Sequence, residues 1–309
     1  MKKKIRIFVA GHTGLIGSAV FRKLKQLNYK NIVVATKKEL NLLDQSKVFD
    51  FLKKKKIKSI IMCAARVGGI KANNNFKGSF IYENLTIQNN LIHGAKINNI
   101  KNLVFLGSSC VYPRKCIQPI KESYLLSGFL EKTNEPYALA KIAGIKMCES
   151  YNYQYKTNFK CLMPTNCFGP GDNYDQETSH FLPALISKIH IAKINNKKFI
   201  TLWGNGKALR EVIYVDDLAD AIIYFLNKKT KHSLINIGTG IEKSIKEYAL
   251  IIARILGVKL SIKYKYKHLT GTPRKILDLS LAKKYGWKSK TNLIKDLKKT
   301  YEAFLLNNN

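Results

Sequence analysis

Short apolar runs alternate with longer stretches of helical periodicity through the first half of the chain. The runs expected to form strands are Ile5–Ala10, Ile32–Ala35, Ser59–Ala64, Leu103–Leu106 and Phe159–Met163. The stretches expected to form helices are Leu15–Leu27, Ser79–Asn98 and Tyr137–Tyr155. Strands that are polar only at their ends and alternate with helices indicate a parallel sheet covered on both faces. We therefore predict an α/β fold with a doubly wound sheet.

The pattern changes after Pro164, where glycine-rich turns punctuate the chain at 169–171 and 203–206 before a strand-like run at Glu211–Val215. No internal repeat or low-complexity linker separates this part from the first. We expect a dinucleotide-binding Rossmann domain over residues 1–168, with residues 211–240 returning to it. Residues 169–210 and 241–309 are expected to form a smaller C-terminal α/β substrate domain.

The composition is that of a folded protein with an unusual charge. Hydrophobic residues make up 46% of the 309 positions, which argues against disorder, and the formal net charge is +34. Most of this charge is lysine spread along the whole length. It is interpreted either as a solvated surface or as a field that attracts anionic partners. The densest run, Lys53–Lys56, is interpreted as a solvated helix end.

Neither the N-terminus nor the cysteines indicate a secreted or membrane protein. Basic residues precede the first apolar run, but Arg6 interrupts that run and Gly11 and Gly14 follow closely, unlike a signal peptide. No window approaches the length of a membrane span. The six cysteines show no Cys-x-x-Cys pair and no zinc spacing, so we expect reduced thiols, no metal site and a cytoplasmic protein without membrane partners.

Three glycines, Gly11, Gly14 and Gly17, lie between the first predicted strand and the first predicted helix. Glycine in this position lets the backbone turn tightly and approach a pyrophosphate, which the amides at the helix N-terminus then bind. Glycines also occur in many ordinary loops. Their place between a strand and a helix near the start of the sequence favours a dinucleotide site.

The end of the second predicted strand bears on the choice of cofactor. Enzymes that prefer NAD usually place an acid there to hold the ribose 2′-hydroxyl. Here Ile32–Ala35 runs into Thr36, Lys37 and Lys38, so a 2′-phosphate would meet cations. This favours NADP(H), although the nearby Glu39 leaves NAD open.

Tyr137 and Lys141 are four residues apart, which puts both side chains on one helix face. A lysine ammonium near a phenol is expected to lower the tyrosine pKa and make it a usable acid. Tyr-x-x-x-Lys alone occurs often by chance. It gains weight from Ser108, which follows the strand Leu103–Leu106 at the sheet edge where ligands bind and where it can hydrogen-bond a substrate oxygen.

Together these motifs resemble the extended short-chain dehydrogenases/reductases, and within them the enzymes that epimerise and reduce GDP-4-keto-6-deoxy sugars. The resemblance runs nearly end to end. The segments that carry it include Glu39–Asp44, Val67–Ile70, Leu106–Cys110, Thr133–Ala138, Met163–Asn166, Ser179–His180, Arg210–Glu211 and Val215–Asp217.

The resemblance implies a division of labour among the site residues. Cys110 and His180 would supply the base and the acid for inversion at C3 and C5, with Cys110 partly as thiolate. Hydride would pass from NADPH to C4 while Tyr137 protonates the oxygen, and Lys141 would bond the nicotinamide ribose. Without the resemblance, Cys110 would be interpreted as a packing residue, and His180 would have no assigned role.

The resemblance also implies the binding residues and the assembly. Lys188, Trp203, Arg210 and Lys275 match contacts to the GDP-sugar, and a homodimer would form through the helices around Ser79–Asn98 and Tyr137–Tyr155. Implied cofactor contacts are Gly11, His12, Thr13, Gly14, Leu15, Ile16, Gly17, Lys37, Leu42, Leu106, Gly107, Ser108, Ser109, Lys141, Pro164, Thr165, Asn166, Cys167 and His180. Thr13 and Lys188 depart from the family, which often carries arginine at both positions.

Several alternatives stay open. The same chemistry could act on a GDP-4-keto-6-deoxy-heptose, or the chain could be another NADP-dependent nucleotide-sugar epimerase/reductase. Dehydration is disfavoured because Ser108–Tyr112 contains no acid. A redox sensor or nucleic-acid-binding protein is suggested only by the charge. It is disfavoured because Tyr137 and Lys141 are retained and no basic stripe with interleaved aromatic residues is present. No nucleic-acid partner is therefore expected.

Overall fold

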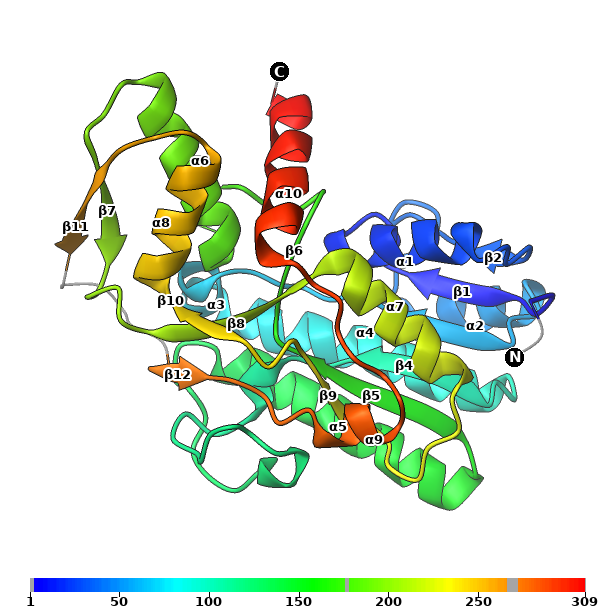
Figure 1. Cartoon of the computed structure of the whole chain (residues 1–309). Coiled ribbons are helices and arrows are strands. Elements are labelled where there is room, and N and C mark those ends of the chain that lie inside the picture. Colours follow the sequence, from blue (N-terminus) through cyan, green and yellow to red (C-terminus); the bar gives the residue numbers. More distant parts are fainter. Residues whose placement is uncertain (1–2, 176–177, 266–271, 309) are drawn as a thin grey trace.

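Six parallel strands form the central sheet of the computed structural model, which describes residues 3–175, 178–265 and 272–308 (Figure 1). Their order across the sheet is β2-β1-β3-β4-β5-β9. The strands are β1 (Ile7–Ala10), β2 (Ile32–Val33), β3 (Ser59–Met62), β4 (Asn102–Leu106), β5 (Asn158–Pro164) and β9 (Leu234–Ile237). Because all pairs are parallel, their carboxyl ends meet at one edge.

Helices cover both faces of this sheet, which explains why its strands are mostly apolar. In β1, Ile7 and Val9 pack into the hydrophobic cluster beneath one layer of helices, and Phe8 and Ala10 pack into the other. The first layer holds α1 (Leu15–Gln26) and α7 (Val215–Asn227). The second holds α2 (Gln45–Lys54), α4 (Lys77–Ile97) and α5 (Glu135–Tyr155). The predicted doubly wound α/β class is confirmed.

The remaining elements form smaller sheets beside the first (Figure 1). In one, β8 pairs with β6, β10 and β12, and in the other β7 pairs with β11. Their bounds are β6 (Asn166–Phe168), β7 (Phe199–Trp203), β8 (Leu209–Tyr214), β10 (Glu242–Ser244), β11 (Ser261–Lys265) and β12 (Arg274–Lys275). The further helices are α3 (Ile70–Asn75), α6 (Phe181–Ile194), α8 (Ile245–Ile255), α9 (Ser280–Lys284) and α10 (Leu293–Asn308). The domain boundaries given above stay a prediction. Across the described ranges, no helix is both long enough and apolar enough to span a bilayer.

Several strand ends differ from the sequence-based expectation by one or two residues; for example, β1 begins at Ile7 rather than Ile5, and β3 ends at Met62 rather than Ala64. β2 ends at Val33 rather than Ala35, because it lies at the sheet edge and pairs only with β1, at two positions. The chain then turns, with the amide of Leu40 donating to the carbonyl of Thr36 at 2.9 Å. β8 ends at Tyr214, and Val215 already opens α7.

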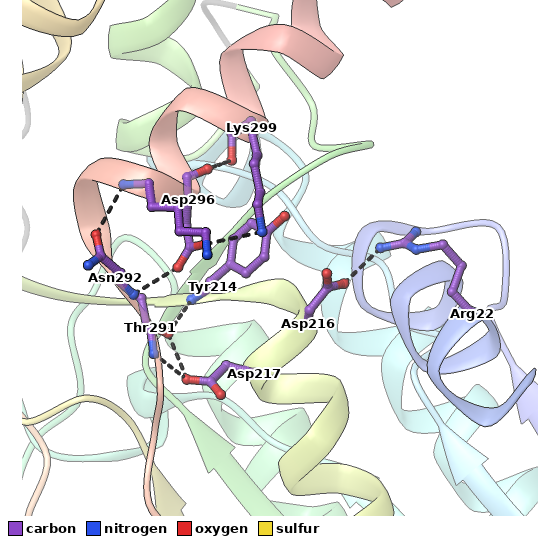
Figure 2. A network of polar contacts seen from close by, with 10 residues as sticks. Arg22, Tyr214, Asp216, Asp217, Thr291, Asn292, Asp296 and Lys299 are labelled. Atoms are coloured by element: carbon purple, nitrogen blue, oxygen red, sulfur yellow. Dashed lines mark hydrogen bonds and ion pairs between the residues drawn. The ribbon is translucent and has the colours of Figure 1, made fainter. Parts of the chain in front are cut away.

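Asp217, in the first turn of α7, fastens the segment that leads into α10 (Figure 2). Its Oδ2 accepts hydrogen bonds from the hydroxyl of Ser289 and from the amides of Lys290 and Thr291, the latter two at 2.6 and 2.8 Å. The Thr291 hydroxyl donates to the same oxygen at 2.8 Å. One carboxylate therefore satisfies four donors from a segment distant in sequence.

Asp217→Ala is expected to lower the free energy of unfolding by roughly 2–3 kcal/mol, because it leaves several donors without their charged acceptor. The matched control is Asp216→Ala. Asp216 pairs with Arg22 at 2.9 Å, but both side chains are about half exposed, so the change should be below about 1 kcal/mol. Denaturant unfolding measures the free energy of unfolding of both variants. Equal decreases in the two variants would contradict the role given to Asp217.

Candidate active site

A cavity of about 620 Å³ lies at the carboxyl edge of the central sheet. Segments that follow β1, β3, β4 and β5 form its walls, as expected for the ligand crevice of an open parallel sheet. Of the predicted cofactor residues, those that line it are Gly11, Thr13, Gly14, Leu15, Ile16, Gly17, Lys37, Leu42, Gly107, Ser108, Ser109, Pro164, Thr165, Asn166, Cys167 and His180. His12, Leu106 and Lys141 do not line the cavity.

The glycine turn has the geometry that a dinucleotide pyrophosphate needs. Gly11 has a φ of +82°, and a Cβ there would lie 2.6 Å from the amide nitrogen of Ala64. A Cβ on Gly17 would lie 2.0 Å from the carbonyl oxygen of Gly11. Gly14 caps α1 without a side chain, so the first amides of the helix face the cavity uncovered. These residues fit a bound dinucleotide.

Glu39, the acid near the end of β2, hydrogen-bonds within the turn that follows this strand. Oε2 of Glu39 accepts hydrogen bonds from the amide and the hydroxyl of Thr36, at 2.7 and 2.9 Å. These bonds lower the pKa of Glu39, so it stays ionised there. Lys37, by contrast, lines the cavity. The arrangement presents a cation, not the acid, to the adenosine end of a bound cofactor.

The sheet edge also brings Ser108, Tyr137 and Lys141 together. Ser108 follows β4 and caps a short 3₁₀ turn at Ser109–Val111, while Tyr137 lies in the first turn of α5. Both line the cavity. Lys141 is buried one helical turn further on, and its Nζ lies 5.7 Å from the ring centroid of Tyr137. That Nζ donates to the carbonyl oxygen of Leu106 at 2.9 Å.

Burial governs the ionisation of Tyr137 and Lys141. It raises the pKa of the Tyr137 phenol, and the neighbouring Cys110 raises it further. Burial lowers the pKa of Lys141 to about 8, against smaller opposing effects of Cys110 and Cys63. Desolvation of the phenolate thus shifts the tyrosine pKa in the direction opposite to the lowering predicted from its spacing to Lys141. Tyr137 holds its proton and is placed to give it away.

The pKa values of Cys110 and His180 are shifted in opposite directions. Burial raises the pKa of the Cys110 thiol, although Lys275 and a hydrogen bond with Ser108 oppose the rise. Burial lowers the pKa of the His180 imidazole, and the charge of Lys275 lowers it further. The thiol is thus protonated at neutral pH, not partly thiolate as predicted. Cys110 can release a proton, and the neutral imidazole of His180, which lines the cavity, can take one.

The four predicted substrate residues form two pairs outside the lining of this cavity. Nζ of Lys188 donates to the carbonyl of Thr201 at 2.9 Å and lies 5.9 Å from the ring centroid of the half-exposed Trp203. Arg210 and Lys275 are opposite each other in the pairing of β8 with β12. Since Lys275 acts on both Cys110 and His180, the second pair lies next to the acid–base groups.

Several parts of the wall were not predicted, and two of them are continuous stretches after strands. Residues 63–68 follow β3, and Gly171, Asp172 and Asn173 lie in the loop after β6. The rule that located Ser108, a position just past a parallel strand, would also have found residues 63–68. Burial raises the pKa of Asp172 to about 7, a shift that only the folded environment creates.

Comparison with known proteins identifies the family. The sequence profile of the NAD dependent epimerase/dehydratase family matches residues 7–238, well over half of the chain. The chain belongs to this family. The family description names NAD dependent epimerases and dehydratases.

Within the NAD dependent epimerase/dehydratase family, this member is 44% identical to the GDP-L-fucose synthase of Escherichia coli (strain K12), over 98% of each chain. Two solved structures share the fold over nearly the whole length. A GDP-mannoheptose C4 reductase from Campylobacter jejuni with NADP bound has a TM-score of 0.90 and 39% identity over 99% of each chain. A GDP-L-fucose synthetase from Naegleria fowleri bound to NADP has a TM-score of 0.90 and 27% identity, covering 100% of this chain and 96% of that one.

Proposed function

We propose that this protein uses NADPH to epimerise GDP-4-keto-6-deoxy-D-mannose at C3 and C5 and to reduce it at C4, giving GDP-L-fucose. The observation that carries the proposal is that Cys110 lies next to Ser108 and acts on Tyr137 and Lys141, while His180 lines the same cavity as Ser108 and Tyr137. Cys110 itself does not line that cavity. The 44% identity to the synthase of Escherichia coli supports the substrate. The NADP-bound relatives, together with Lys37 at the cavity and Glu39 held by Thr36, support the cofactor.

In the epimerisation, one group removes the proton beside the C4 ketone and the other returns a proton to the opposite face of the same carbon. The number of protons on the sugar does not change. The neutral imidazole of His180 and the thiol of Cys110 form such an acceptor and donor at neutral pH. Lys275 favours the loss of the Cys110 proton through its charge, which opposes the effect of burial on that pKa.

In the reduction, a dinucleotide held at the glycine turn would supply the hydride for C4. Tyr137 supplies the proton for the oxygen, so that one C=O becomes one CH–OH. Ser108 orients that oxygen by a hydrogen bond. Lys141, fixed on the carbonyl of Leu106, stabilises the negative charge left on Tyr137, and the solvent then reprotonates the phenolate.

The GDP half of the substrate is proposed to lie along the two pairs described above. The indole of Trp203 offers a stacking surface for the base, with Lys188 next to it. Arg210 and Lys275 supply positive charge for the pyrophosphate. Lys188 gives a point charge where an arginine would give a two-pronged contact.

Binding of GDP should weaken as the pH rises through about 8, because burial lowers the pKa of Lys275 to about 8. The ammonium is complete below that pH and is lost above it. In Lys275→Arg the cation persists to far higher pH, so its affinity should stay level between about pH 7 and about pH 9.5. Calorimetric titration with GDP measures both profiles, and parallel profiles would contradict the assignment of Lys275 to the pyrophosphate.

A second candidate is the same chemistry on a GDP-4-keto-6-deoxy-heptose. The likeness to the GDP-mannoheptose C4 reductase supports it, at 39% identity. The contacts proposed for GDP are common to both substrates, so they do not favour one sugar over the other.

The test is to incubate the protein with NADPH and each GDP-4-keto sugar, and to follow NADPH absorbance and the sugar protons by NMR. We expect GDP-L-fucose from the hexose, with a higher kcat/KM than for the heptose. Absence of NADPH oxidation with the hexose would overturn the proposal, and turnover of the heptose alone would establish the second candidate. Repeating the assay with NADH measures the cofactor preference.

We also propose a homodimer that works in the reducing cytoplasm. Apolar side chains stay exposed on the adjacent helices α4 and α5, namely Tyr82, Ile97, Leu139 and Tyr153. All six cysteines are free thiols, which fits a reducing compartment. Sedimentation should show a dimer that Leu139→Glu converts to monomer. The control Ile194→Glu, at an exposed position on α6, should leave the dimer intact.

A further inference from the structure

Glu211 of β8 is a fully buried carboxylate that the reaction scheme does not use. Its Oε1 accepts hydrogen bonds from the amides of Thr239 and Gly240, at 2.6 and 2.7 Å. Its Oε2 accepts one from the amide of Leu277 at 3.0 Å. Each oxygen therefore holds a different segment, the loop after β9 on one side and the segment after β12 on the other. A buried charge bound in this way imposes a definite geometry on its donors.

The backbone of Glu211 contacts the wall of the dinucleotide cavity. Its carbonyl oxygen accepts hydrogen bonds from the hydroxyl of Thr165 at 2.9 Å and from the side-chain amide of Asn166 at 3.0 Å. Both residues line the cavity. These contacts involve only main-chain atoms of Glu211, so they persist when its side chain is changed.

The side chain of Glu211 instead serves the segment that carries Lys275. β12 has only two residues, Arg274 and Lys275, so contacts on either side of it fix its position along β8. The side chain of Gln118 hydrogen-bonds the carbonyl of Arg274 and the amide of Ile276. The backbone of Ile120 pairs with that of Ile276 and Asp278, and Arg274 forms an ion pair with Glu242. On one side, the amide of Leu209 donates to the carbonyl of Pro273 at 2.9 Å. On the other, the amide of Leu277, two residues beyond Lys275, is held by Oε2 of Glu211.

The residue before Glu211 is Arg210, which is opposite Lys275 in the strand pairing. Glu211 thus follows Arg210, one proposed pyrophosphate contact, in the sequence. Through Leu277 its side chain also anchors the segment that carries Lys275, the other proposed contact. Of these two connections, only the one to the Lys275 segment depends on the carboxylate of Glu211. A change at the carboxylate should therefore displace Lys275 while leaving β8 and the cofactor wall in place.

We propose that Glu211 is a positioning residue that sets Lys275 against Arg210 for binding the substrate's pyrophosphate. The inference rests on the proposed function, because it takes both cations as contacts for a GDP-sugar. It assigns Glu211 to substrate affinity and not to cofactor binding.

The first test is Glu211→Gln, which keeps the shape of the side chain but replaces one acceptor oxygen by an amide nitrogen. If the remaining oxygen keeps the two donors Thr239 and Gly240, the bond to Leu277 is lost. We expect the Kd for GDP and the KM for the GDP-sugar to rise about 10- to 100-fold, from the loss of a hydrogen bond to a charged group. The Kd for NADPH, measured by fluorescence, should change less than about threefold.

A matched control is Glu247→Gln. Glu247 also accepts two hydrogen bonds, from the amide and hydroxyl of Ser244, but it closes a capping box at the start of α8. Its loss should lower stability without raising the Kd for GDP. If both variants weakened GDP binding equally, the effect would reflect a general loss of fold stability, and the proposal would be overturned.

A double-mutant cycle tests whether Glu211 acts through Lys275. If it does, Glu211→Gln combined with Lys275→Ala should bind GDP no more weakly than Lys275→Ala alone. Full additivity of the two effects would overturn the proposal. Because the cycle uses GDP binding, it is independent of which sugar is turned over. Failure of the wild-type protein to bind GDP would instead refute the proposed function.

If Glu211→Gln does not fold, Gly238→Ala provides a second variant that retains the charge. A Cβ at Gly238 would lie 2.2 Å from Oε1 of Glu211, so the carboxylate must shift. We expect the same rise in the Kd for GDP with NADPH binding preserved. An unchanged Kd for GDP in a folded Gly238→Ala protein would contradict the proposal.

Discussion

Tyr137→Phe is expected to slow the reduction of the GDP-4-keto sugar by about 10²- to 10⁴-fold, which is the typical rate contribution of a general acid. The ring of Tyr137 packs edge-on against Phe80, with centroids 6.3 Å apart, and phenylalanine preserves that contact. The variant should therefore fold and bind NADPH normally. It lacks the proton that burial keeps on the phenol by raising its pKa.

Proton exchange at C3 and C5 should survive in Tyr137→Phe, because Cys110 and His180 are intact. Incubation in D₂O followed by NMR measures the exchange, and single-turnover absorbance measures the reduction. Loss of both activities together, with NADPH binding retained, would mean that Tyr137 also serves the epimerisation.

Cys110→Ser is expected to have the complementary effect. Solvent-deuterium exchange at C3 and C5 should fall by at least about 10²-fold, because a hydroxyl gives up its proton far less readily than a thiol. The side chain is only 7% exposed, and serine is close to it in shape, so NADPH binding should be unchanged. Exchange at the wild-type rate would reduce Cys110 to a packing residue.

The two variants together separate the stages of the reaction. Purified Tyr137→Phe should accumulate deuterated keto-sugar, and addition of Cys110→Ser should then convert it to the alcohol with NADPH consumption. This complementation requires release of the epimerised ketone into solution. If neither the exchange nor the rescue occurs, the acid–base groups are elsewhere in the site.

Most of the central sheet was predictable because its inner strands are buried on both faces, but β9 was not predicted as a strand, and β2 at the edge is only partly buried. Such inner strands are mostly apolar, as at Ile7–Ala10, and the pattern requires no knowledge of partners. The smaller sheets were not predictable in this way. Their strands have two to six residues, and β12 pairs with β8 from a position far along the chain, so the pairing depends on the fold and not on a local pattern.

The candidate site was predictable where chain geometry alone dictates position. The glycines follow a strand and open a helix, Ser108 follows a strand, and Lys141 is one turn from Tyr137. Ionisation was not predictable, since the spacing of Tyr137 and Lys141 shows their proximity but not their burial. The same holds for Cys110, whose expected thiolate character burial opposes.

Glu211 and Gly238 have a consequence for how this family diverges. The carboxylate occupies the space into which any side chain at position 238 would project. The two positions therefore cannot vary independently in descendants of this sequence. A lineage that gains a larger residue at 238 should first, or simultaneously, shorten or lose the acid at 211. Correlated substitution at these two positions across related sequences would record that constraint.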